Sequence, residues 1–129
     1  MLSWGKHLIL DARQCYIPLI ACPNNVAAFS RTLVRRIDMV AHGEPWVKYF
    51  GSGDKAGLTL VQLIETSNIT AHFCEESGDA YIDVFSCKDF RDNDVEECVR
   101  EYFRPLRLRT RVVYRGERPV PDLEIPQLS

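Results

Sequence analysis

The sequence predicts an α+β fold, a two-layer sandwich in which an antiparallel sheet carries two helices on one face. Several short runs alternate apolar and polar residues, as strands with one buried face do. Two longer segments instead place apolar residues at helical spacing, and the order strand, helix, strand occurs twice. Because the helices would cover only one face of the sheet, the other face is left to be covered. We therefore expect a second layer or a homodimer.

The size and composition of the chain narrow the function classes. Its 129 residues and 46% hydrophobic content fit one domain, residues 1–129. The net charge of −2 gives no reason to expect nucleic acid or a membrane as a partner. No apolar run is long enough to span a bilayer, and the start lacks a signal-peptide pattern. The five cysteines form no Cys-x-x-Cys pair, so we expect reduced thiols, a cytoplasmic protein and no metal site.

The first half of the chain predicts one strand, one helix and two more strands. Residues 6–12 alternate as a strand. Pro23-Asn24-Asn25 is a start signal with an asparagine able to cap a helix, which is expected over residues 25–41 and ends at the His42-Gly43 step. Its apolar stripe comprises Val26, Phe29, Leu33, Ile37 and Val40. Residues 46–51 and 57–65 predict the next two strands.

The second half predicts a hairpin, a helix and a last strand. Residues 65–87 contain two strand-like runs joined by a polar turn at residues 75–79, in which Gly78 can take positive φ. Asp89 or Asp92 is expected to cap the second helix, which Pro105 ends. Its apolar stripe comprises Val95, Cys98, Val99 and Tyr102, and residues 106–114 form the last strand.

The last strand carries a row of arginines. Arg107, Arg109 and Arg111 alternate with less polar residues, so they share one face. Basic edge strands resist unwanted pairing, and no aromatic residues are interleaved at the spacing of an RNA-binding motif. We therefore expect a solvated or interface face and no nucleic-acid partner. Residues 115–129 hold three prolines without periodicity and are predicted to form an extended tail.

Reactive side chains occupy fixed positions on the hairpin. Ser67 opens a strand, His72 follows five residues later, and Cys87 lies twenty residues after the serine in the ending Asp-Val-Phe-Ser-Cys. Gly5-Lys6-His7-Leu8 opens the first strand. In this register the chain resembles the self-cleaving, pyruvoyl-dependent S-adenosylmethionine decarboxylases of the short bacterial type, from about residue 5 to about residue 116.

The resemblance implies that the chain makes its own cofactor. The Ser67 hydroxyl would attack the Thr66 carbonyl and divide the proenzyme into chains 1–66 and 67–129, with a covalent pyruvoyl group on residue 67. That keto group would react with the amine of S-adenosylmethionine and withdraw electrons while carbon dioxide leaves. The product would supply spermidine synthesis. A homodimer with active sites near the subunit interface is also implied.

The resemblance assigns roles to further residues. His72 would assist the elimination during processing, and Thr59 stands where the family usually has a serine that helps processing. Cys87 would protonate the substrate carbon after decarboxylation. Glu76 occupies the place of a glutamate that holds the substrate ribose.

Three positions depart from the family pattern. Thr66 replaces a common glutamate, Asn68 replaces a histidine, and Cys74 replaces an aromatic residue near the purine pocket. Phe73 or Phe50 is expected to supply the missing ring. Two alternatives stay open: a pyruvoyl-dependent decarboxylase of ornithine or arginine, and an uncleaved paralogue that regulates an active partner.

Overall fold

The computed structural model describes residues 3–116, so the predicted tail lies outside the described residues except for Arg115 and Gly116. The six strands form one antiparallel sheet in the order β2-β3-β4-β5-β1-β6. The strands are β1 (Gly5–Arg13), β2 (Ala41–Phe50), β3 (Gly57–Ile64), β4 (Ser67–Phe73), β5 (Ala80–Ser86) and β6 (Arg107–Arg115). The helices are α1 (Ile17–Ile20), α2 (Pro23–Arg36), the 3-10 turn η1 (Gly53–Lys55) and α3 (Asp92–Phe103).

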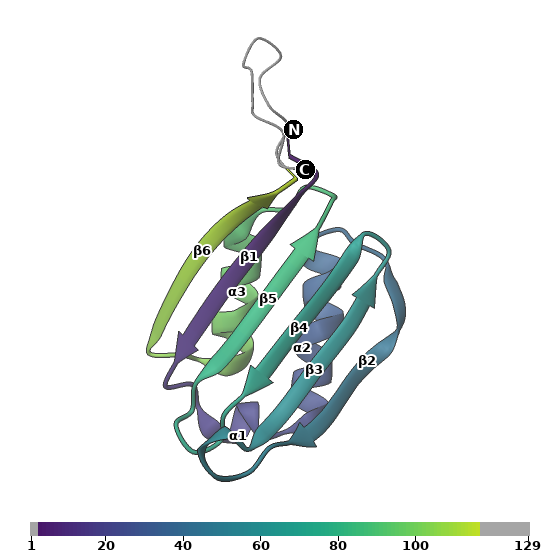
Figure 1. Cartoon of the computed structure of the whole chain (residues 1–129). Helices are drawn as coiled ribbons and strands as arrows, with labels where there is room; N and C mark the ends of the chain where they lie inside the picture. The colour runs from purple at the N-terminus through teal and green to yellow at the C-terminus, as the bar shows by residue number, and fades with distance from the viewer. Residues whose placement is uncertain (1–2, 117–129) are drawn as a thin grey trace, which may run out of the picture.

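Both long helices lie on the same side of the sheet, and no element of residues 3–116 covers the opposite side (Figure 1). This confirms the predicted α+β architecture. The core between the layers is built around Phe29 of α2, Phe73 of β4 and Phe103 of α3, all fully buried. The Phe103 ring centroid lies 4.7 Å from that of Phe29 and 4.9 Å from that of Phe73, so one aromatic cluster joins both helices to the sheet.

The first long helix is shorter than predicted. It begins at Pro23 and ends at Arg36, whereas residues 25–41 were expected, and His42-Gly43 lies inside β2. Asp38 has a left-handed φ of 56°, which is incompatible with a continuing right-handed helix and which aspartate tolerates better than most residues. The Val40 carbonyl then accepts the Glu65 N–H at 2.8 Å, so pairing with the sheet region has already begun.

Neither predicted helix cap is present. The residue before α2 is Cys22, without a side-chain cap, and the Asn25 amide instead donates to the carbonyls of Leu19 and Tyr102 at 3.0 and 3.1 Å. These two bonds link α1, α2 and α3. The residue before α3 is Arg91, also without a side-chain cap, while Asp92 is the first helical residue.

The sheet face opposite the helices is partly apolar. Strand alternation directs Trp46 of β2, Leu63 of β3 and Tyr81 of β5 to this open face, and each side chain is about half exposed. At one sheet edge the arginine row of β6 is exposed, which agrees with its expected place on an edge strand. In the described part of the chain, no helix has the length and apolar character needed to span a bilayer.

A buried lysine joins β1 to the start of α3. Only 6% of Lys6 is exposed, and its ammonium donates to the Phe90 carbonyl and to Asp92 Oδ1, the latter at 2.7 Å. The same nitrogen lies 4.1 Å from the centroid of the Phe90 ring. The segment between Cys87 and α3 is therefore tied to the strand that begins the sheet.

Replacing Asp92 with alanine should lower the free energy of unfolding by about 2 to 3 kcal/mol. The change leaves a desolvated ammonium without its carboxylate. Because the Asp92 side chain is itself 39% exposed, the loss of stability lies at or below the lower end of the range for broken buried ion pairs. Denaturant titration measures the difference. Asp94→Ala is the matched control, because Asp94 also lies in the first turn of α3 but contacts no described cation. Equal losses in both variants would contradict a stabilising role for the Lys6–Asp92 pair.

Candidate functional site

Ser67 stands at the first residue of β4, directly after a two-residue turn. Ile64 of β3 pairs with Ser67, so Glu65 and Thr66 form the tip of the β3–β4 hairpin. The predicted scissile bond between Thr66 and Ser67 therefore joins the turn to the strand. The φ of Ser67 is 159°, which is extended backbone.

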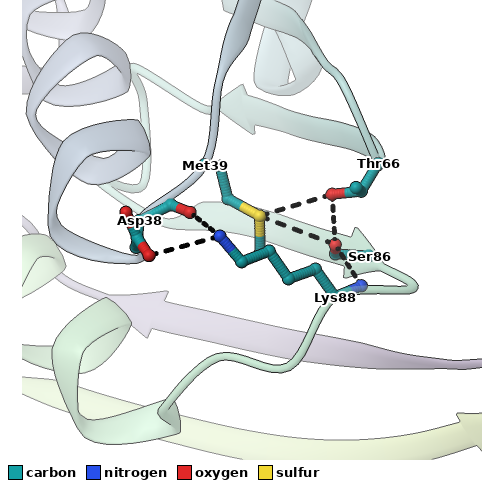
Figure 2. Close-up of polar contacts among 5 residues, drawn as sticks. All are labelled: Asp38, Met39, Thr66, Ser86 and Lys88. Carbon is teal, nitrogen blue, oxygen red and sulfur yellow. Dashed lines mark hydrogen bonds and ion pairs between the residues drawn. The ribbon is translucent and has the colours of Figure 1, made fainter.

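The Thr66 carbonyl faces the end of β5. The Cys87 N–H donates to this oxygen at 3.2 Å, one step beyond the paired residues Ser67 and Ser86. The Thr66 hydroxyl lies 2.7 Å from the Ser86 hydroxyl (Figure 2). The structure thus brings Ser67, the carbonyl that it is expected to attack, and Cys87 to one end of the sheet.

His72 and Thr59 form a second pair on neighbouring strands. His72 Nδ1 lies 2.8 Å from Thr59 Oγ1, and Nε2 lies 2.7 Å from the Lys55 carbonyl oxygen. A carbonyl oxygen can only accept, so Nε2 carries the proton and Nδ1 of the neutral ring accepts from the Thr59 hydroxyl. If this pair abstracted a proton, Thr59 Oγ1 would take it up. The hydroxyl proton of Thr59 would at the same time pass to His72 Nδ1.

The two groups are at opposite ends of β4. Five residues of extended strand separate Ser67 from His72, which corresponds to about 17 Å. Strand alternation also places His72 on the open face, together with Asn68, whereas Ile69 and Phe73 point into the core. The expected nucleophile and the expected base therefore do not meet within one protomer.

The predicted substrate residues lie at the His72 end of the hairpin. Glu76 is exposed in the turn, where Gly78 has the expected positive φ of 81°. Phe50 is 44% exposed, and its ring lies 5.8 Å from that of Trp46. Phe73, by contrast, is fully buried against Phe103, so the expectation that it could stack on a ligand is wrong. Every second side chain of β4 from Ile69 onward points into the core, and Phe73 is one of them.

Burial separates Cys87 from most of the other cysteines. Cys87 is partly exposed, whereas burial raises the pKa of the Cys15 and Cys98 thiols to about 12. The pKa of the Cys74 thiol is also raised, first by burial and then by the nearby Asp79 carboxylate. All five thiols are free, and no metal-binding cluster of His, Cys, Asp or Glu occurs in residues 3–116.

A cleft of about 780 Å³ lies between the ends of β1 and β6, and none of the predicted site residues lines it. Its lining comprises Arg13, Gln14, Arg107, Leu108 and Arg109. The Arg13 guanidinium also pairs with Asp79 at 3.1 Å. The cleft therefore contains none of the groups that the expected chemistry requires.

Two site residues were missed by the sequence reasoning. Ser86 is fully buried and contacts Thr66, and Trp46 lies beside Phe50 on the open face. Ser86 could have been recognised, because alternation places it on the buried side with Val84, and a buried hydroxyl needs a partner. Trp46 has no comparable signal, since the pairing of β2 with β3 is a tertiary feature.

Comparison with known proteins finds two sequence relatives, one solved structure of the same fold and a matching family model. The chain is 28% identical over 123 residues to the S-adenosylmethionine decarboxylase proenzyme of Thermomicrobium roseum, covering 90% of this chain and 97% of that protein. It is 28% identical over 88 residues to the protein of the same name from Pyrococcus furiosus, covering 68% of this chain and 60% of that protein. A crystal structure of the adenosylmethionine decarboxylase from Aquifex aeolicus has the same fold, with a TM-score of 0.73 at 20% identity over 98% of this chain and 100% of that one. The family model for S-adenosylmethionine decarboxylase matches residues 6–116, so the chain belongs to the S-adenosylmethionine decarboxylase family.

Proposed function

We propose that this protein decarboxylates S-adenosylmethionine after cutting its own backbone between Thr66 and Ser67. The observation that carries the proposal is the arrangement at the β3–β4 turn. Ser67 follows the carbonyl that it would attack, and that carbonyl already accepts a hydrogen bond from the Cys87 N–H at 3.2 Å. Family membership supplies the reaction class, since two relatives are named S-adenosylmethionine decarboxylase proenzymes.

Cleavage proceeds through the atoms of residues 66 and 67. The Ser67 hydroxyl oxygen bonds to the Thr66 carbonyl carbon, and the peptide C–N bond breaks to give an ester and a free amine. Loss of the Ser67 Cα proton then expels the Thr66 carboxylate and leaves a dehydroalanine. Its enamine tautomerises, one water adds and one ammonia leaves, giving the pyruvoyl group. The residues present fit this group, because only serine yields it without an extra methyl.

The pyruvoyl group would supply the electron sink for decarboxylation. The chain's own residues would orient the substrate and move protons. Cys87 is partly exposed at the end of the sheet that holds Ser67, where its thiol can donate a proton to the substrate carbon. Glu76 and Phe50 would bind the ribose and the purine. The His72–Thr59 pair would take the Cα proton during processing.

The separation of these groups supports a homodimer. Within one protomer the Ser67 end and the His72 end are about 17 Å apart, so neither end holds a complete site. A second copy placed against the open face in the reverse direction would bring each Ser67 to the partner's His72 end. The half-exposed Trp46, Leu63 and Tyr81 give this face apolar area to bury.

Intact mass and substrate assays test the proposed function. The purified protein should resolve into two fragments ending and beginning at the 66–67 bond, whose summed mass shows one water gained and one ammonia lost. Carbon dioxide should be released from S-adenosylmethionine and not from ornithine or arginine. Turnover of either amino acid without turnover of S-adenosylmethionine would show that the amino acid is the substrate. The observation that favours this rival is that Phe73 and Cys74 are both buried. A chain that never splits would support the regulatory paralogue.

Replacing Cys87 with serine should permit cleavage but slow turnover by about 100-fold, because a positioned general acid is lost. Cys22→Ser is the control, since Cys22 is also partly exposed but lies before α2. Single-turnover assays on fully cleaved protein measure the effect. Equal rates and an identical product for the Cys87 variant would exclude this thiol from proton transfer.

A further inference from the structure

The Thr66 carbonyl oxygen is the atom that gains negative charge when Ser67 attacks. Its hydrogen bond from the Cys87 N–H is the last rung between β4 and β5, beyond the pair Ser67–Ser86. A backbone donor aimed at a developing oxyanion stabilises the transition state more than the starting amide. The contribution of this hydrogen bond to the cleavage rate therefore depends on how firmly residues 66 and 87 are held together.

The Ser86 side chain contacts both of the backbone segments that this hydrogen bond joins. Its buried hydroxyl lies 2.7 Å from Thr66 Oγ1 and accepts the Lys88 N–H at 3.0 Å. Thr66 supplies the carbonyl, and Lys88 directly follows the residue that supplies the N–H. One side chain thus connects the two backbone segments whose separation sets the 3.2 Å contact (Figure 2).

Each of the two hydroxyl protons has an acceptor within reach. Met39 Sδ lies 3.3 Å from Thr66 Oγ1 and 3.7 Å from Ser86 Oγ, and sulfur in a thioether only accepts. One hydroxyl therefore donates to the other, and the second donates to the sulfur. Among the described residues, no buried side-chain polar atom is left without a partner.

The end of α2 supports the same segment. The Lys88 ammonium contacts the Asp38 carbonyl oxygen and also Asp38 Oδ2, the latter at 3.2 Å (Figure 2). The Lys88 side chain is 47% exposed and that of Asp38 is 97% exposed, so this ion pair contributes little energy by itself. The hydroxyl pair is the buried part of the arrangement.

We propose that Thr66 and Ser86 are positioning residues for self-cleavage: their paired hydroxyls hold the Thr66 carbonyl against the Cys87 N–H. The Cys87 N–H donates a hydrogen bond and keeps its proton, while the electrons of the attacked carbonyl move to oxygen and return when the C–N bond breaks. This proposal rests on the proposed cleavage at Thr66–Ser67. It also gives Thr66 a role that depends on its hydroxyl.

Cleavage kinetics of four variants test the assignment. Each chain is synthesised in a cell-free system, synthesis is stopped, and the loss of full-length protein is followed on denaturing gels. Thr66→Val and Ser86→Ala should each cleave about 10- to 100-fold more slowly, since misplacing a reacting group costs up to this factor. The double variant should be no slower than the slower single variant, because both changes break one contact. Ser86→Thr keeps a hydroxyl and should cleave about as fast as the unaltered chain.

Thr32→Val is the matched structural control. Thr32 Oγ1 lies 2.6 Å from the Tyr102 hydroxyl, so this variant removes a similar contact far from the turn. Melting temperatures identify a variant that fails to fold, and Thr66→Val lies in a partly exposed turn where folding tolerates change. Cleavage of the Thr66 and Ser86 variants at the unaltered rate, or equal slowing by Thr32→Val, overturns the positioning role. An unaltered chain that stays intact overturns self-cleavage itself and this role with it.

Discussion

Replacing Ser67 with alanine should leave the chain uncut and without decarboxylase activity. Alanine lacks the hydroxyl that would attack the Thr66 carbonyl, so neither the ester nor the pyruvoyl group can form. The fold should be unchanged, because Ser67 is partly exposed and its hydroxyl makes no hydrogen bond to a described side chain. Intact mass should show one full-length species after incubation long enough to split the unaltered protein completely.

Ser77→Ala provides the control for this experiment. Ser77 lies in the β4–β5 turn at the opposite end of the hairpin, where its hydroxyl accepts only the local Asp79 N–H at 3.1 Å. This variant should split at the normal rate. Fragments of the same mass from the Ser67 variant would show that another group attacks the backbone, and circular dichroism would establish that both variants are folded.

Mixing two inactive chains should restore cleavage. Neither Ser67→Ala nor His72→Ala is expected to process alone, since one lacks the nucleophile and the other the base. In a mixed dimer, the Ser67 of the His72→Ala chain faces the intact His72–Thr59 pair of its partner. Coexpression with distinguishable tags should therefore yield fragments of the His72→Ala chain only. The physical reason is the separation of about 17 Å along β4 within each protomer.

The mixed-dimer experiment needs a histidine control and a check on assembly. His42→Ala removes an exposed histidine of β2 and should process alone. Size-exclusion chromatography establishes that the coexpressed chains associate. Normal cleavage of the His72→Ala chain alone would remove His72 from processing. Associated chains that never split would place the complete site within one protomer.

The sequence alone was sufficient for the sheet and for most strand positions. Alternation identified β3, β4 and β5 to within a residue or two, because each buries one face over its whole length. The same alternation directs Phe73 into the core, away from a substrate. Family resemblance, from the serine, histidine and cysteine in register, was confirmed by the match over residues 6–116.

Helix ends and caps could not be predicted, since tertiary contacts decide them. Ile37 and Val40 continue the apolar stripe of α2, but the left-handed Asp38 ends the helix and Val40 already bonds to Glu65 of the β3–β4 turn. Asn25 has the chemistry of a cap, yet its amide joins the other two helices instead. Local propensity differs by fractions of a kcal/mol per residue, which such contacts readily exceed.

The amino-acid order by itself determined that this is a two-layer α+β protein and that Ser67, His72 and Cys87 have the spacing on which the resemblance to the family depends. Only the tertiary structure decided which of these groups meet. Strand pairing brings Ser67 and Thr66 to Ser86 and Cys87, while an extended β4 holds His72 at the far end. The physical reason is that a rigid, hydrogen-bonded strand sets distances along the chain, whereas the register between strands sets contacts across it.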